Sequence, residues 1–112
     1  MSYGGGDEGP TPYEYLGAAL GSCTYMTLNG YARRKELNVA QVSVHVTHTR
    51  IHAEDCEACE KQEGKVDQFS REISITGDIT DEQRKRMLEI ADRCPVHKTL
   101  ENEIQIITSL KL

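Results

Sequence analysis

The sequence contains no tryptophan and only one phenylalanine, and hydrophobic residues make up 38% of its 112 positions. No apolar run approaches the roughly 18 residues that a membrane-spanning helix requires, and the first residues do not form a signal peptide. We therefore expect a cytoplasmic protein that does not bind membranes. So few apolar residues can form only a small hydrophobic core in one domain of this size. We therefore expect a homodimer or a larger assembly, which would bury more apolar surface.

A basic surface is also missing. The formal net charge is -5, and no basic cluster is longer than the one at residues 33–35. Nucleic-acid binding is therefore not expected. The four cysteines then stand out, because thiols in a reducing compartment more often serve as metal ligands or redox groups than as structural disulfides.

The chain reads as a flexible segment, residues 1–10, followed by one domain, residues 11–112. Residues 11–36 predict a long helix that carries Cys23 near its middle. Thr11 and Glu14 have the spacing of a capping box, in which each side chain accepts a hydrogen bond from a free backbone N–H. One apolar face is expected to follow at helical spacing. It comprises Leu16, Ala19, Leu20, Cys23, Thr27 and Tyr31.

The rest of the chain alternates strand and helix patterns. The expected elements are strands at 39–51 and 66–79 joined by a polar loop, a helix from Thr80 to about Arg93, a short helix from Cys94 to about Glu101, and a strand at 102–112. In the last strand, Ile104 and Ile106 are expected to face inward. This order predicts an α+β fold in which an antiparallel sheet packs on the long helix.

Cys94 is followed by Pro95, a pair typical of a helix N-cap and first position. Free backbone N–H groups and the positive end of the helix dipole stabilise a thiolate, so the pKa of Cys94 should fall. His97 can reach the same side of the first turn. A plain capping or core role for Cys94 explains the motif equally well.

A second pair of cysteines lies in the polar loop. His52, Cys56 and Cys59 have the spacing of metal ligands, and structural zinc takes four such ligands. Two or three come from one loop, so a second chain would have to complete the site. A labile disulfide between Cys56 and Cys59, or two idle thiols, are the alternatives. Nearby acids raise the pKa of these thiols and oppose their use as nucleophiles.

Two segments together carry a family resemblance. Residues 12–24, PYEYLGAALGSCT, followed by residues 94–97, CPVH, resemble the OsmC/Ohr superfamily of osmotically induced and organic-hydroperoxide-resistance proteins. The resemblance runs from about Gly9 to the C-terminus. Members of that superfamily are cysteine-based peroxidases that form intertwined homodimers around a long central helix.

The resemblance implies roles for individual residues. Cys23 matches the peroxidatic cysteine and Cys94 the resolving one, in a cycle that reduces a small hydroperoxide and is restored by an external dithiol. No cofactor is required. Glu14 is a candidate catalytic residue, because it lies one position after Tyr13, which occupies the place of a family glutamate. Its role in the capping box is an adequate structural account.

The sequence departs from the family pattern at an arginine. In the family this arginine lies on an N-terminal segment and keeps the peroxidatic thiol ionised, yet residues 1–22 contain neither arginine nor lysine. Two other hypotheses therefore stay open. The first is a non-catalytic dimeric binding module, with zinc at Cys56 and Cys59. The second is that all four thiols serve packing or assembly.

Overall fold

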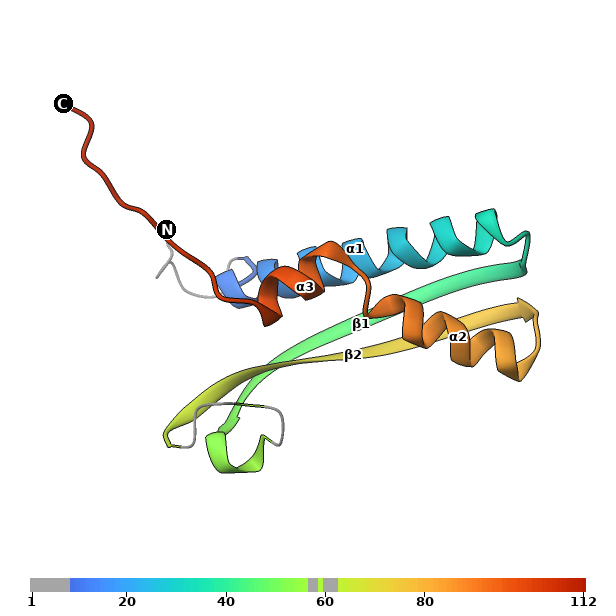
Figure 1. Ribbon diagram of the computed structural model, residues 1–112, viewed down its shortest axis with the longest axis horizontal. Coiled ribbons are helices and arrows are strands. Elements are labelled where there is room, and N and C mark those ends of the chain that lie inside the picture. The colour runs from blue at the N-terminus through green and yellow to red at the C-terminus, as the bar shows by residue number, and fades with distance from the viewer. Residues whose placement is uncertain (1–8, 57–58, 60–62) are drawn as a thin grey trace.

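The computed structural model describes residues 9–56, 59 and 63–112, so most of the expected flexible segment 1–10 lies outside the described residues. The chain has the expected α+β class, with an antiparallel hairpin packed on a long helix (Figure 1). Its elements are α1 (Pro12–Arg34), β1 (Asn38–His52), the 3-10 turn η2 (Ala53–Asp55), β2 (Lys65–Asp78), α2 (Asp81–Ala91) and α3 (Pro95–Glu101).

The helices begin where the sequence predicts. At α1, the backbone N–H of Thr11 donates to Glu14 Oε1 over 2.9 Å, and the backbone N–H of Glu14 donates to Thr11 Oγ1 over 3.1 Å. Thr80 and Gln83 form the same capping box at α2. Such reciprocal bonds satisfy backbone donors that the helix itself leaves free, and they fix where each helix starts.

Strands β1 and β2 pair along their whole length, with Val44 opposite Ile73 and Val46 opposite Arg71. The pairing shifts register between Val39 and Gln41, opposite Gly77. Gly77 has a φ of 137°, and a Cβ there would collide with the backbone of β1. Only glycine fits this bulge, so the bulge fixes which residues of the hairpin face inward.

The core lies where the inward face of the hairpin meets α1 and α2. Leu28 and Met87 have no exposed surface. The buried cluster comprises Leu28, Ala32, Val42, Ile75, Met87, Ile90 and Ala91. This cluster lies at the end of the hairpin where β1 follows α1 and β2 leads into α2. The opposite end, where β1 runs into η2, extends away from the helices (Figure 1).

The buried face of α1 differs from the predicted one. It comprises Gly17, Leu20, Thr24, Leu28 and Ala32, whereas Leu16 is 43% exposed. Close approach of the strand explains the rotation of the face. A Cβ added to Gly21 would lie 3.3 Å from Val46 Cγ2, so the small residues of α1 set the contact with β1. Apolar spacing alone does not reveal a face that glycine forms.

The strand predicted at residues 102–112 is wrong for the single chain. After α3 the chain has no secondary structure, and the segment runs away from the body of the molecule (Figure 1). Ile106 is 84% exposed, and Ile104, expected to face inward, is 53% exposed. A strand needs a neighbouring ladder, and within the described residues β1 and β2 pair only with each other. The apolar side chains of this segment therefore have no surface in the described part of the same chain to pack against.

Candidate functional site

The fold brings Cys23 and Cys94 together although 71 positions separate them in the sequence (94 − 23). Cys23 lies in the middle of α1 and is partly exposed, whereas Cys94 caps α3 and is fully buried. Helix α3 lies against α1 (Figure 1), and this contact sets the two thiols within hydrogen-bonding reach of each other. Both are free thiols.

The surroundings of the pair favour a thiolate on Cys94. Burial opposes its ionisation, but three kinds of hydrogen bond outweigh burial and lower the pKa of Cys94. They come from the thiol of Cys23, the backbone N–H groups of His97 and Val96, and the side chain of Thr24, whose hydroxyl also donates to the carbonyl of Leu20 over 2.7 Å. The His97 N–H lies 3.4 Å from the Cys94 sulfur. These donors stabilise the charged form, as the capping position predicts.

Cys23 shifts in the opposite direction. Burial raises its pKa, and the hydrogen bond and charge of Cys94 raise it further, against weaker opposing bonds from Val96 and Thr27. The two thiols therefore titrate as a pair whose first thiolate lies on Cys94. Accessibility has the reverse order, because Cys23 is the exposed member of the pair. The thiol that ionises more readily is thus the buried one, and the partly exposed thiol ionises less readily.

Arg71 is a residue that the sequence reading missed. It lies on β2, 12% of its side chain is exposed, and its guanidinium faces the thiol site. One nitrogen donates to Thr24 Oγ1 over 2.9 Å and to the carbonyl of Ala91 over 3.1 Å. The other contacts Asp92 Oδ1 at 2.9 Å and His97 Nδ1 at 2.7 Å. The sequence marks it only as an arginine two positions before Ile73, and therefore on the same inward face of the strand.

The contacts of His97 fix the proton on its ring. A guanidinium only donates, so Nδ1 accepts from Arg71 and the proton lies on Nε2. Nε2 donates to Glu101 Oε1 over 3.0 Å. This bond holds the ring against α3, while the backbone N–H of the same residue points at Cys94. His97 therefore acts on the cysteine through its main chain.

Glu14 lies away from the thiols. Its carboxylate accepts the backbone N–H of Thr11, and it precedes Cys23 by nine positions (23 − 14). At 1.5 Å per residue this is about 13 Å along the helix axis. The neighbouring Tyr13 stacks on His48 of β1 with ring centroids 4.4 Å apart. Both residues thus fasten the start of α1, and a direct contact of Glu14 with either thiol is not observed.

The second cysteine pair has a different form. Cys56 and Cys59 are joined in a disulfide, with Cα atoms 5.5 Å apart. In this state neither sulfur has a thiolate to offer a metal. Among the described residues, no group of three histidine, cysteine or acidic side chains is arranged to hold a metal ion, and His52 belongs to no such group. The disulfide was one of the three possibilities for this loop, and zinc binding by the reduced loop stays a prediction.

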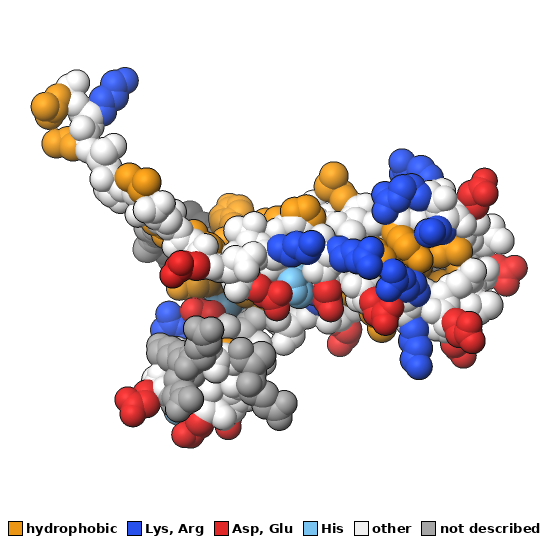
Figure 2. Space-filling model, in the orientation of Figure 1, with side chains coloured by type: hydrophobic (Ala, Val, Ile, Leu, Met, Phe, Trp, Pro, Cys, Tyr) orange, Lys and Arg blue, Asp and Glu red, His pale blue; other side chains and the backbone are white. Residues whose placement is uncertain are grey.

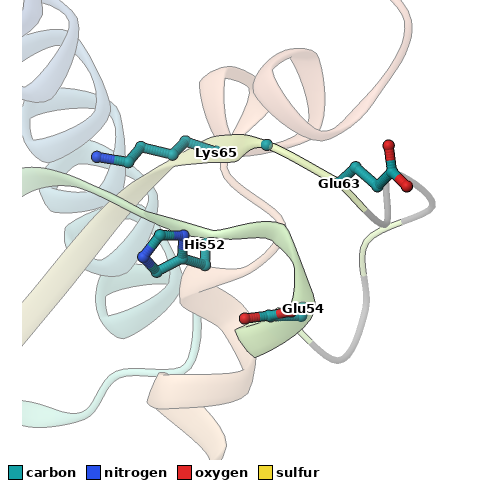
Figure 3. Close-up of a pocket in the computed structure, with 5 residues that line it drawn as sticks. His52, Glu54, Glu63 and Lys65 are labelled. Carbon is teal, nitrogen blue, oxygen red and sulfur yellow. The ribbon is translucent and has the colours of Figure 1, made fainter.

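An open hollow lies at the end of the hairpin. Its volume is about 360 Å³, and it is lined by His52, Glu54, Glu63, Gly64 and Lys65. Figure 3 shows His52, Glu54 and Lys65 projecting to one side of the hairpin end, whereas Glu63 points away. The lining carries charges of both signs and no nucleophilic thiol, so the thiol chemistry of the chain lies at Cys23 and Cys94.

Comparison with known proteins identifies the kind of molecule that carries this site. The family model described as OsmC-like protein matches residues 4–109. No curated protein matches the sequence. Within the described residues, no helix is long and apolar enough to cross a membrane.

Solved structures show the same fold at low sequence identity. An OsmC-like hydroperoxide resistance protein from Jannaschia sp. has a TM-score of 0.68 and 22% identity, covering 95% of this chain and 71% of that one. An organic hydroperoxide resistance protein from Legionella pneumophila has a TM-score of 0.64 and 18% identity, with 89% and 69% covered. An OsmC-like protein from Mycoplasma pneumoniae has a TM-score of 0.66 and 22% identity. The match covers 85% of this chain and only 64% of that protein.

Proposed function

Because the chain belongs to the OsmC-like protein family, we propose that it is a thiol-dependent peroxidase that reduces organic hydroperoxides with Cys23 and Cys94. The observation that carries this proposal is the meeting of these two free thiols across 71 residues of sequence. The names of the structural neighbours, which include hydroperoxide resistance proteins, supply the substrate class. Cys23 is assigned the attack because it is the exposed thiol of the pair.

The first step begins with the proton that the two thiols share. Cys23 passes its proton to the Cys94 sulfur, which is the more stable thiolate of the resting pair. The Cys23 thiolate attacks the terminal oxygen of the hydroperoxide, so that a sulfur–oxygen bond forms and the O–O bond breaks. The departing alkoxide takes a proton from Cys94 and leaves as the alcohol. Cys23 is now a sulfenic acid, and Cys94 is a thiolate again.

In the second step the Cys94 thiolate attacks the sulfur of the Cys23 sulfenic acid. A disulfide forms, and hydroxide leaves and becomes water with a proton from solvent. An external dithiol then reduces the disulfide by two thiol–disulfide exchanges and is itself oxidised. The cycle therefore transfers two electrons from the dithiol to the hydroperoxide. We assign it to the cytoplasm, where such reductants are maintained.

The working form is proposed to be a homodimer. Apolar side chains of α1 are exposed, among them Tyr15 at 62% and Met26 at 71%, and Figure 2 shows apolar atoms along the helix and the C-terminal segment. Small residues of α1 and the side chains of Val44 and Val46 also line an open groove beside β1. A second copy would cover these surfaces and give the residues after α3 a strand partner.

An anaerobic thiol count tests the enzymatic proposal. The protein is treated with one equivalent of cumene hydroperoxide, and free thiols are counted before and after. We expect two thiols to disappear, Cys23 and Cys94, and a Cys23–Cys94 disulfide to appear in the mass spectrum. Cys23→Ser should lose none. Unchanged thiols in the wild type, or equal losses in both proteins, would exclude the peroxidase and favour the non-catalytic binding module.

A further inference from the structure

Arg71 connects every element that holds the thiol pair. Its two terminal nitrogens contact Thr24 on α1, Ala91 and Asp92 at the end of α2, and His97 on α3. Each of these contacts is 3.1 Å or shorter. A guanidinium presents its donors in a rigid fork, so the partners are fixed relative to one another and not only to the arginine.

Two arms of this network converge on the sulfur of Cys94. One runs through Thr24, a fully buried residue whose hydroxyl accepts from Arg71 and lies within hydrogen-bonding reach of the sulfur. The other runs through the ring of His97 to its backbone N–H, which donates to the same sulfur. Thr24 is also the neighbour of Cys23 on α1, so the first arm ties the position of one thiol to that of the other.

From this geometry we infer that Arg71 is the positioning residue of the thiol site, holding Cys94 against α1 so that its sulfur can close a disulfide with Cys23. The inference deepens the proposed function and rests on it for the identity of the oxidant. Arg71 touches neither sulfur and is not itself a catalytic residue. Its effect should fall mainly on disulfide closure, which needs the two sulfurs aligned, and less on the oxidation of Cys23, in which Cys94 only exchanges a proton.

The cost of losing Arg71 follows from its contacts. Replacement by lysine keeps the charge but loses the fork, and replacement by glutamine loses both. Without the fork the turn that carries Cys94 loses its charged link to α1 and β2 and keeps its backbone bonds and the contacts of the Cys94 sulfur with Cys23 and Thr24. Displacement of a reacting group by about 1 Å typically slows a reaction by about 100-fold. We therefore expect closure in Arg71→Gln to slow by roughly 10- to 100-fold, with Arg71→Lys between that and the wild type.

The test measures closure with two oxidants. Cumene hydroperoxide is used with dimedone, which traps the Cys23 sulfenic acid before it condenses. Diamide is used in parallel, because it adds to one thiol and is displaced as a hydrazine by the other, giving the same disulfide without a peroxide. Disulfide formation is followed by acid quenching and mass spectrometry. Arg50→Gln is the matched control, because Arg50 pairs with the exposed Asp67 on the same hairpin and with Tyr13 at the start of α1, and it shares no partner with Arg71.

Slower closure with both oxidants and more trapped sulfenic acid would support the inference, with a smaller change in the rate of Cys23 oxidation than in the rate of closure. Asp92→Asn, which removes one charged partner of the fork, should move closure in the same direction by less. Closure at the wild-type rate in a folded Arg71 variant would overturn it. Unfolding of both Arg71 variants would overturn it too, because the arginine would then be a purely structural residue. If the wild type closes with diamide but ignores the hydroperoxide, the proposed function fails while the role of Arg71 stands.

Discussion

Two pairs of cysteines in one chain have opposite characters. Cys23 and Cys94 are distant in the sequence, meet inside the fold and remain free thiols. Cys56 and Cys59 are three positions apart, lie at the far end of the hairpin and are joined in a disulfide. The difference shows that proximity along the chain and readiness for chemistry are separate properties. Donors that converge on one sulfur prepare the first pair, whereas the second pair is already closed within one short loop.

The largest expected difference between the two cysteine pairs is their effect on the rate of hydroperoxide turnover. Removing a nucleophile usually costs several orders of magnitude in rate, so we expect Cys23→Ser to lose more than about 100-fold of hydroperoxide turnover. Cys94→Ser should lose most multiple turnover but still oxidise Cys23 once, more slowly than the wild type because the sulfur that exchanges the proton is gone. The double variant Cys56→Ser/Cys59→Ser is the control and should keep its rate. Steady-state consumption of cumene hydroperoxide with a dithiol decides the matter, and loss of activity in the control would remove the distinction between the pairs.

Stability is expected to depend on the core near the first pair more than on the second. Met87 has no exposed surface, so Met87→Ala should lower the free energy of unfolding by about 2–5 kcal/mol. The Cys56–Cys59 disulfide closes a very short loop, and its loss should cost about 2 kcal/mol or less. Urea denaturation of both variants at one protein concentration gives the comparison. A larger loss for the disulfide variant would contradict it.

The pKa shifts predict opposite movements for two single variants. The thiol of Cys23 helps to lower the pKa of Cys94, so in Cys23→Ala the Cys94 thiolate should form at higher pH than in the wild type. Cys94 raises the pKa of Cys23, so in Cys94→Ala the Cys23 thiolate should form at a lower pH than Cys23 requires beside Cys94. Thiolate absorbance against pH measures both, because the disulfide contributes no thiolate. Shifts in one common direction would show that the thiols do not share a proton.

Zinc gives the smallest expected effect. Only the reduced loop offers thiolates, and four ligands complete a structural site. We expect no zinc on the oxidised protein and about one ion for two chains after reduction, with Cys56 and Cys59 as ligands. Metal analysis after gel filtration checks this, with Cys56→Ser as the control. Equal zinc in the control and the wild type would assign the metal elsewhere.

The sequence predicts local structure well where the signal is local. The capping boxes at Thr11 and Thr80 and the cap at Cys94 depend on neighbouring residues, and all three form. The strand expected after α3 depends on a ladder partner, and the described residues of one chain do not supply it. Alternation of apolar and polar residues indicates which side chains of a segment can be buried. It does not indicate which other strand or helix covers them.

The thiol site shows the same limit. The motifs at Cys23 and Cys94 identify two thiols, and helix spacing and capping place each of them on its element. Arg71 escapes this reasoning because a lone arginine in a strand has no motif. It becomes informative only when the register of the hairpin points it at Thr24 and His97. Long-range hydrogen bonds of this kind are set by tertiary structure and have no periodic trace in the sequence.

The sulfur of Cys94 also serves as the N-cap acceptor of α3, through the backbone N–H of His97. A covalent bond to Cys23 would leave this sulfur uncharged and therefore a weaker acceptor for the amide than a thiolate is. Oxidation would then loosen the opening turn of a seven-residue helix, directly upstream of the exposed C-terminal residues. Solvent exchange at this one amide would thus report, without any added probe, whether Cys23 and Cys94 are joined or free.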